Sequence, residues 1–218
     1  MQYSFKYSKL TRSKINKLID CFLLGLPTLQ VAKYTGTHRN TVNRFFKRIR
    51  IKIANYLKKE DKIFKGKIEL DEAYFGGRKK GGRGRGSKNK RLVFGILERG
   101  GRVKTIIVDN VEAKNLMKKI VKNTEKGCVY YTDKFKSYNS LSRYGKHFKI
   151  DHAKEFRKEK HNHINGIEGF LSYAKKFLIK YNGISKKNFY LYLKEIEWRF
   201  NNRKKRDIKT KLLQIIKS

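Results

Sequence analysis

The stretch that most constrains the fold of this chain is residues 67–77, which read KIELDEAYFGG. The apolar run predicts a strand over Ile68–Phe75, and this strand carries Glu69, Asp71 and Glu72 before a double glycine. Side chains of a strand alternate between faces, so Glu69 and Asp71 share one face and Glu72 takes the other. Burying a carboxylate is costly unless a partner or a metal ion stabilises it. The stretch is therefore either an edge strand with solvated acids or a central strand with a metal-binding carboxylate.

Two more acidic residues support the metal interpretation. Asp133 follows a strand-like run over Cys128–Thr132, and Glu168 lies near the start of a helix-like segment over Asn165–Tyr181. Hard divalent cations such as Mg²⁺ prefer oxygen ligands and are usually held by a few carboxylates together with substrate phosphates. Two such ions can clamp the attacking and leaving oxygens of a phosphoryl displacement.

The charge of the chain indicates that its partner is a polyanion. Lys and Arg number 56 and Asp and Glu number 18, which gives a net charge of +38 spread along the whole sequence. Nucleic acid is the natural partner of such a surface. A structural RNA-binding protein would carry the same charge, so charge alone leaves that class open.

The first 57 residues contain three apolar patterns at helical spacing. They predict helices over 12–24, from Thr28 to about Tyr34, and from Thr37 onward, with a sharp turn at Gly36. A short helix, a glycine turn and a basic helix are the parts of a helix-turn-helix, whose Arg and Asn side chains can read base edges. An ordinary three-helix bundle with a solvated basic face is the alternative. The candidate DNA contacts of the third helix are Arg39, Asn40, Asn43, Arg44, Lys47 and Arg48.

Residues 76–91 predict a basic loop. They hold six glycines and eight Lys or Arg, and no apolar residue. Such a segment cannot pack a core, and it is either a disordered hairpin tip or a loop that becomes ordered on DNA. Its candidate phosphate contacts are Arg78, Lys79, Lys80, Arg83, Arg85, Lys88 and Lys90.

The order of strand-like and helix-like runs after residue 66 predicts the fold class. Three strands, a helix, a strand, a helix, a strand and a long helix follow one another, which is the ribonuclease-H-like order. Strands one and four should be neighbours and bring Asp71 and Asp133 together. We expect a mixed α/β chain with a helix-turn-helix domain over 1–57, a linker over 58–66, a five-stranded ribonuclease-H-like catalytic domain over 67–203, and a basic C-terminal helix and tail over 204–218. The expected strands are 67–75, 92–98, 103–109, 128–132 and 147–150, and the expected helices of this domain are 112–123, 134–144, 165–181 and 187–203.

Four blocks of sequence carry a family resemblance. They read LDEAYFGG at 70–77, YYTDKFKSY at 130–138, HNHINGIEGFLSYAKK at 161–176 and YLKEIEWRFNNR at 192–203. Together and in this order they resemble the DDE transposases of bacterial insertion sequences, specifically the ISXO-like group. Lys175 lies seven residues after Glu168, as in the pattern of that family. The chain does not begin with the cysteine-rich zinc ribbon of many members and is similar to the shorter branch.

The resemblance implies a transposase that acts on the ends of an insertion sequence. By resemblance, Asp71, Asp133 and Glu168 hold two Mg²⁺ or Mn²⁺ ions and Lys175 contacts a phosphate. The implied reaction is cleavage at each terminal inverted repeat followed by strand transfer into target DNA, without a covalent protein intermediate. Two ends must be held at once, so a homodimer or larger assembly on DNA is expected.

Further polar residues are weaker candidates for the site. Asp109 ends a strand but can also cap the next helix, and Asp151 lies in a polar loop. Glu69 and Glu72 are candidate supporting groups next to Asp71. His161 is a candidate contact to DNA or to Glu168, because the pair His161 and His163 has no third ligand nearby. The rival class is a helix-turn-helix repressor on an inactive ribonuclease-H-like body.

The remaining composition bears on location. No run of 18 apolar residues and no apolar signal core are present, so we expect neither a membrane span nor secretion. Cys21 and Cys128 lie in apolar runs and indicate buried thiols in a reducing compartment. We therefore expect a bacterial cytoplasmic protein that associates with the nucleoid through DNA.

Overall fold

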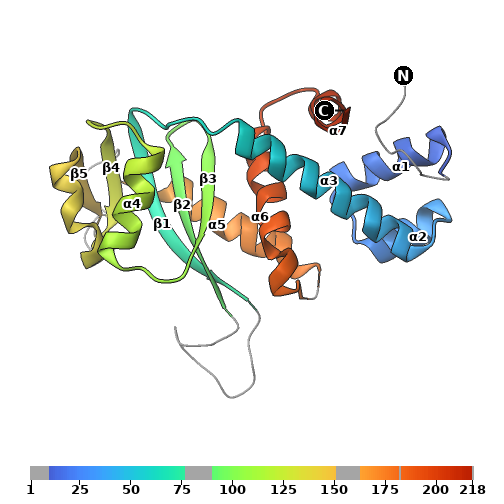
Figure 1. Cartoon of the computed structure of the whole chain (residues 1–218), viewed down its shortest axis with the longest axis horizontal. Helices are drawn as coiled ribbons and strands as arrows, with labels where there is room; N and C mark the ends of the chain where they lie inside the picture. Colours follow the sequence, from blue (N-terminus) through green and yellow to red (C-terminus); the bar gives the residue numbers. More distant parts are fainter. Residues whose placement is uncertain (1–9, 77–89, 151–162, 182, 218) are drawn as a thin grey trace, which may run out of the picture. The chain divides into compact units, whose positions relative to one another are not determined.

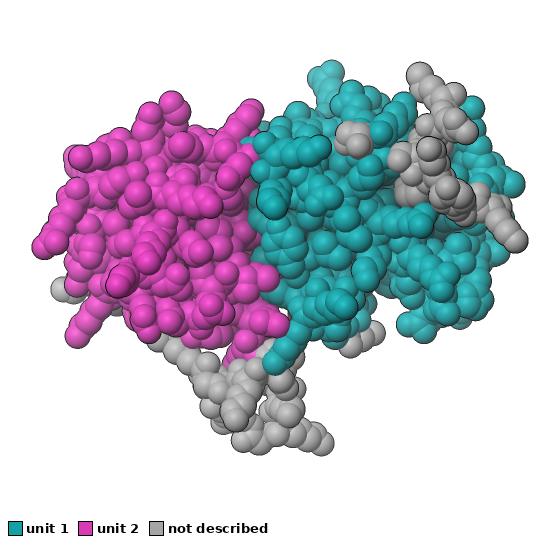
Figure 2. Space-filling view, viewed as in Figure 1, with its two compact units in different colours: residues 1–60, 180–218 teal, residues 61–179 magenta. Residues whose placement is uncertain are grey.

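The computed structural model describes residues 10–76, 90–150, 163–181 and 183–217 (Figure 1). The chain forms two compact units, which Figure 2 colours separately. Unit 1 combines residues 1–60 with residues 180–218, and unit 2 is residues 61–179. The break at 60/61 falls inside the expected linker. Residues 180–203, which we expected in the catalytic domain, group with the N-terminal helices instead, because the helix they form packs into the core of unit 1.

Unit 2 is built on a mixed five-stranded sheet, which confirms the expected fold class. The strand order is β3-β2-β1-β4-β5. β1 pairs antiparallel with β2 and parallel with β4, while β2–β3 is antiparallel and β4–β5 is parallel. This is the ribonuclease-H-like arrangement. The strands are β1 (Lys67–Phe75), β2 (Arg91–Glu98), β3 (Val103–Val108), β4 (Val129–Asp133) and β5 (Lys146–Ile150).

The alternation of side chains along β1 separates two faces of the sheet. Ile68 and Leu70 are fully buried in one core with residues of α4 (Ala113–Asn123) and of the 3₁₀ helix η1 (Lys136–Arg143). Glu69 points to the other face, where its carboxylate meets the first turn of α5 (Asn165–Ile179). Figure 1 shows α4 and α5 on opposite sides of the sheet. The acids of β1 that share a face with Glu69 therefore lie toward α5.

The segment expected as a helix over 134–144 is shorter and of a different type. It forms η1, whose buried residues Tyr138 and Leu141 are three positions apart. Side chains at i and i+3 eclipse one another in a 3₁₀ helix, so this spacing gives it a buried edge.

Unit 1 is all helical and contains both ends of the described chain. The helices are α1 (Arg12–Leu23), α2 (Thr28–Thr35), α3 (Arg39–Lys59), α6 (Lys186–Asn201) and α7 (Ile208–Lys217). The core of unit 1 contains a cluster of buried apolar residues from α1, α2, α3, α6 and α7, in which Trp198 of α6 is fully buried. Gly36 ends the second helix with a φ of 59°, in the left-handed region that glycine adopts readily. The third helix begins at Arg39, two residues after the expected start, and is capped by His38, whose imidazole Nδ1 accepts from the Asn40 N–H at 3.3 Å.

A buried charge network joins α3 to α6 within unit 1. The Arg50 Nε donates to Glu195 at 2.7 Å, and the exposed fractions of the two side chains are 4% and 0%. Arg199 donates to the other oxygen of Glu195 at 2.9 Å and to the carbonyls of Phe22 and Leu23 at the end of α1. The inward face of α3 is thus fixed by a salt bridge as well as by apolar packing.

Among the described residues, no helix combines the length and the apolar character that a membrane-spanning helix needs.

Candidate functional site

The two strand aspartates lie on neighbouring strands of the sheet. The last paired residues of the parallel ladder are Glu69 of β1 and Tyr131 of β4, and each strand carries an aspartate two positions further on. Because the side-chain period of a strand is two, Asp71 and Asp133 face the same side as Glu69. The Asp71 Oδ1 accepts from the Glu72 N–H at 2.8 Å, and the Asp133 Oδ1 accepts from the Phe135 N–H at 3.0 Å.

Asp71 experiences the charge of three other acids. Burial raises the pKa of Asp71, a hydrogen bond from the Glu72 N–H opposes this, and the charges of Glu72, Asp133 and Glu168 raise it further, to about 7. A carboxylate held near several like charges favours either a proton or a cation. Asp71, Asp133 and Glu168 therefore share one electrostatic neighbourhood, although they are distant in sequence.

Glu168 and Lys175 lie on α5. Glu168 is half-buried in the first turn, where the helix dipole favours a negative charge. Lys175, two turns later, is exposed, and its Nζ lies 5.9 Å from the centre of the Phe75 ring at the end of β1. α5 thus places one acid and one base on the side of the sheet that Asp71 faces.

The two other acids of β1 are committed to partners. Glu72 lies on the α4 face and accepts from the Tyr138 hydroxyl at 2.5 Å. Burial and the charge of Glu72 raise the pKa of Tyr138, so this hydroxyl stays protonated and donates. Glu69 is 1% exposed and accepts from the Arg99 Nε at 2.8 Å and from the Ile167 N–H at 2.9 Å. Sequence reasoning missed Arg99 and Tyr138, because no local pattern links them to β1.

The DNA-contact candidates divide into described and undescribed residues. All six candidates on α3 (Arg39, Asn40, Asn43, Arg44, Lys47 and Arg48) are exposed. Lys90 is half-buried just before β2. The other basic loop candidates (Arg78, Lys79, Lys80, Arg83, Arg85 and Lys88), together with Asp151 and His161, lie outside the described residues.

Asp109 and His163, two weaker candidates, have local surroundings unlike those expected of metal ligands. Asp109 is exposed at the end of β3, and it is Asn110 whose Oδ1 accepts from the Glu112 N–H before α4, at 3.2 Å. His163 is half-buried, with its Nδ1 3.7 Å from a Glu69 oxygen. The His163 ring therefore lies next to Glu69, and His163 is two residues before the start of α5.

The donor chemistry of the site suits a hard divalent cation. Carboxylate oxygens are the ligands that Mg²⁺ and Mn²⁺ take, and a positive ion would offset both the burial and the like charges that raise the pKa of Asp71. Within the described ranges, no three His, Cys, Asp or Glu side chains are gathered closely enough to hold an ion. The charges of Asp71, Asp133 and Glu168 influence one another, but their carboxylates would have to move closer together to bind a metal ion.

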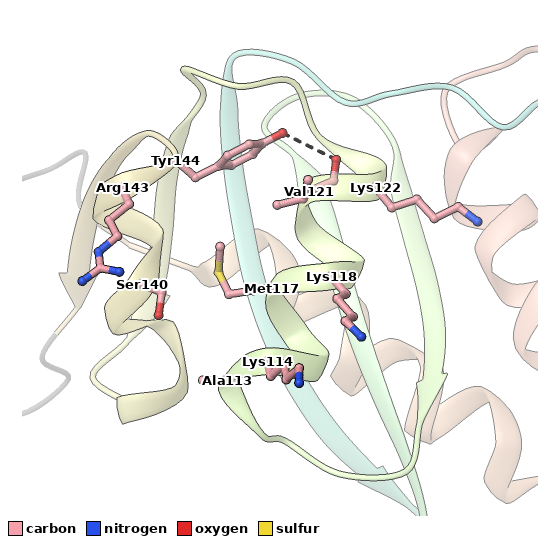
Figure 3. Close-up of a pocket in the computed structure, with 9 residues that line it drawn as sticks. All are labelled: Ala113, Lys114, Met117, Lys118, Val121, Lys122, Ser140, Arg143 and Tyr144. Atoms are coloured by element: carbon pink, nitrogen blue, oxygen red, sulfur yellow. Dashed lines mark hydrogen bonds between the residues drawn. The ribbon is translucent and has the colours of Figure 1, made fainter.

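A hollow between α4 and η1 lies on the other face of the sheet. Met117 and Val121 contribute its apolar part, and the Tyr144 hydroxyl donates to the Val121 carbonyl at 3.5 Å (Figure 3). The hollow contains none of the acids discussed above, so we assign it no part in the chemistry. Its lining is Ala113, Lys114, Met117, Lys118, Val121, Lys122, Ser140, Arg143 and Tyr144.

Comparisons with known proteins point to one family. The model of a family described as ISXO2-like transposase domain matches residues 63–201. An uncharacterized transposase-like protein of Haemophilus influenzae is 43% identical over 118 residues, which are 53% of this chain and 94% of that protein. The Mos1 strand transfer complex and the Mos1 paired-end complex with the left transposon end are each 10% identical, with TM-scores of 0.31 and 0.32. These matches cover 100% of this chain and 81% and 82% of those chains.

Proposed function

Because this chain belongs to the family of the ISXO2-like transposase domain, we propose that it binds the ends of an insertion sequence and catalyses metal-dependent DNA cleavage and strand transfer. Membership confirms the resemblance carried by the sequence blocks. The observation that supports the catalytic proposal is the placement of Asp71 and Asp133 just beyond the last paired residues of two neighbouring parallel strands, with Glu168 in the first turn of α5.

The proposed reaction has two displacements at phosphorus. In the first, a water oxygen attacks the phosphodiester at each end of the element, the bond to the 3′ oxygen breaks, and that oxygen takes a proton. In the second, the freed 3′ hydroxyl loses its proton and attacks a target phosphodiester, whose own 3′ oxygen leaves. When bound, two Mg²⁺ or Mn²⁺ ions supply charge neutralisation and activation of the attacking oxygen.

The residues of this chain have distinct parts in that proposal. Asp71, Asp133 and Glu168 would hold the ions, and Lys175 would contact a phosphate close to them. The carboxylates must be ionised and correctly placed, because catalysis in such a site is mainly positioning and charge neutralisation. The six exposed candidates of α3 would read the terminal inverted repeats, and the basic loop would contact any DNA backbone.

The assembly and the location follow from the same proposal. Two element ends and a target must be held together, so the protein is proposed to act as a homodimer or larger complex on DNA. We place it in the bacterial cytoplasm, associated with the nucleoid. The high positive charge of the sequence supports this partner.

The catalytic proposal predicts the outcome of three isosteric substitutions. Asp71→Asn, Asp133→Asn and Glu168→Gln each remove a charge but keep the shape, so each should abolish end cleavage and strand transfer with DNA affinity nearly intact. Combining two should add little, because residues that act as a unit are not additive. The measurement is cleavage of labelled end DNA in Mg²⁺, with gel-shift affinity beside it.

Two further variants calibrate that assay. Asp109→Asn, an exposed acid at the end of β3, should keep activity and serves as the matched control. Lys175→Ala should be intermediate, because the phosphate near the ions loses its cationic partner while the carboxylates remain. Full activity in any one of the three acid variants would refute the site. A wild-type protein that binds ends tightly but never cuts them would favour the repressor.

A further inference from the structure

Glu69 is a buried charge that the proposed chemistry does not use. Its side chain is 1% exposed, and an ionised carboxylate in such a place is very costly without partners. Arg99 supplies the opposite charge at 2.8 Å, and the Ile167 N–H donates to the second oxygen at 2.9 Å. Each oxygen of the carboxylate therefore has a defined partner, one from the turn after β2 and one from α5.

The partners of Glu69 adjoin all three proposed metal ligands. Glu69 itself lies two residues before Asp71 on β1, and the Ile167 N–H lies one residue before Glu168. The Arg99 guanidinium lies 3.6 Å from the centre of the Tyr131 ring, and Tyr131 is two residues before Asp133 on β4. The Glu69–Arg99 pair and the residues it contacts therefore lie within two residues of each of the three proposed ligands.

The pair also fixes where α5 begins. The first N–H groups of a helix have no partner within the helix, so a carboxylate that accepts from one of them holds the first turn in place. Arg99 donates as well to the carbonyl of His163, just before α5. The first turn of α5 is therefore held by two contacts, one at the His163 carbonyl before the helix and one at the Ile167 N–H within it.

Glycines make the close approach of α5 possible. A Cβ on Gly166 would lie 2.8 Å from the Glu69 Oε2, and a Cβ on Gly95 would lie 2.6 Å from the Ile167 Cδ1. Real Cβ atoms are not found so close to other heavy atoms. The first turn of α5 therefore lies close against β1 at Gly166 and against β2 at Gly95.

We propose that the Glu69–Arg99 ion pair is the positioning element that sets the first turn of α5, and hence Glu168, against Asp71 and Asp133. This inference rests on the proposed function, since it assigns a purpose to the position of Glu168. Glu69 touches no substrate and holds no metal in this scheme. It acts through the Ile167 N–H and through Arg99.

The test uses two different substitutions in the full chain. Glu69→Gln removes the charge, and Gly166→Ala forces the Glu69 carboxylate and the first turn of α5 apart while keeping every charged group. Each should weaken Mn²⁺ binding, measured by electron paramagnetic resonance, by about tenfold or more, as for other residues that orient metal ligands. Each should also make amide exchange of the first turn of α5, measured by mass spectrometry, about three- to tenfold faster.

A matched control separates positioning from general destabilisation. Glu197→Gln breaks a buried pair with Lys194 on α6, in unit 1, where the two side chains are 2.6 Å apart. It should leave Mn²⁺ binding and the first turn of α5 unchanged. An equal loss of Mn²⁺ binding in Glu197→Gln, or unchanged exchange of the first turn in both test variants, would overturn the positioning role.

The same experiment distinguishes failure of the proposed function. If the wild-type protein binds Mn²⁺ and protects the first turn but does not cut end DNA, the catalytic proposal fails and the positioning role stands. If the wild-type protein binds no Mn²⁺, the amide exchange rates of the first turn of α5 alone test the positioning role.

Discussion

Thr132 and His147 hold the end of the strand that carries Asp133. The Thr132 hydroxyl donates its only proton to the Asp133 carbonyl at 2.7 Å, and its oxygen lies 2.8 Å from the His147 Nε2. With the hydroxyl proton directed at that carbonyl, the His147 ring is the donor of this second contact, through its Nε2–H. Burial and, to a smaller extent, the charge of Lys149 lower the pKa of His147 to about 4. The neutral ring is part of the support of the strand end.

This leads to a pH-dependent stability. Because the folded pKa of His147 is below its usual value of 6.5, the folded protein binds fewer protons than the unfolded chain between about pH 4 and 6.5. The stabilisation is complete above pH 6.5 and is lost as the pH falls through this window. His147→Gln should remove about 1–2 kcal/mol of that dependence, discounted for partial exposure. Urea unfolding of both proteins at pH 5 and pH 7.5 measures it, and parallel curves would exclude His147 as the cause.

At the scale of elements, α3 has two faces with different tasks. Its outer face carries the exposed DNA-contact candidates, and its inner face carries Arg50, which is 3% exposed. Arg50 pairs with Glu195 and lies 3.8 Å from the centre of the Tyr192 ring. Although burial alone would raise the pKa of Glu195, the charges of Arg50 and Arg199 hold it below the ordinary value. The network stays ionised and fixes the helix that presents the outer residues.

Breaking this network should destabilise unit 1 strongly. Glu195→Ala leaves two guanidinium groups without their carboxylate in a buried place, so we expect a loss of about 3–5 kcal/mol in the free energy of unfolding. Trp198 is the single tryptophan of the chain and lies in the same core, so its fluorescence reports the unfolding. Glu125→Ala removes an exposed pair with Lys65 in unit 2 and should cost below about 1 kcal/mol. Equal losses in both variants would contradict the assignment.

The outer face of α3 leads to a prediction about sequence preference. Arg44→Ala and Asn43→Ala should each relax the preference for element ends over random DNA by about 1–3 kcal/mol, because a good bidentate base contact is worth that much. Lys17→Ala, an exposed change on α1, is the control and should alter both DNAs alike. Competition gel shifts measure the preference. An unchanged ratio of affinities in both α3 variants would remove α3 as the reading helix.

At the scale of the whole molecule, we expect substitutions of lysines in the basic loop to change the overall affinity for DNA without changing the preference for one DNA sequence over another. Replacing Lys79 and Lys80 by Gln should weaken binding to every DNA equally and reduce the slope of log affinity against log salt by about 0.9 for each phosphate that the protein no longer neutralises. Titrations at several salt concentrations, with element ends and with random DNA, measure both slopes. A loss confined to element ends would show that these lysines read sequence.

Local patterns in the sequence predicted much of the fold. Alternation along β1 and the order of apolar runs predicted the mixed sheet, because strand period and element order are encoded locally. The same alternation assigned Glu69 to the face opposite Ile68 and Leu70, which the contact between Glu69 and α5 confirms. Whether Asp71, Asp133 and Glu168 hold metal stays a prediction.

Long-range partners could not be predicted in this way. Arg99 and Glu69 are 30 residues apart, and Arg50 and Glu195 are 145 apart, so no window of periodicity contains both members of either pair. The burial of Trp198 has the same origin, since its helix meets α1 and α3 from the other end of the chain. Such pairings depend on how each unit closes on itself, and one sequence without an alignment does not encode them locally.

The core of unit 1 combines residues from both ends of the sequence, which has a consequence for synthesis on the ribosome. Phe22, Phe46 and Ile49 are made early, while Trp198 and Leu212, which complete their core, are made only after all of unit 2. A nascent chain that stops inside the sheet thus carries α3 on an uncovered apolar surface. We therefore expect the proposed recognition of DNA to require both halves of unit 1, and we expect a prematurely terminated chain to be bound by chaperones and degraded by proteases.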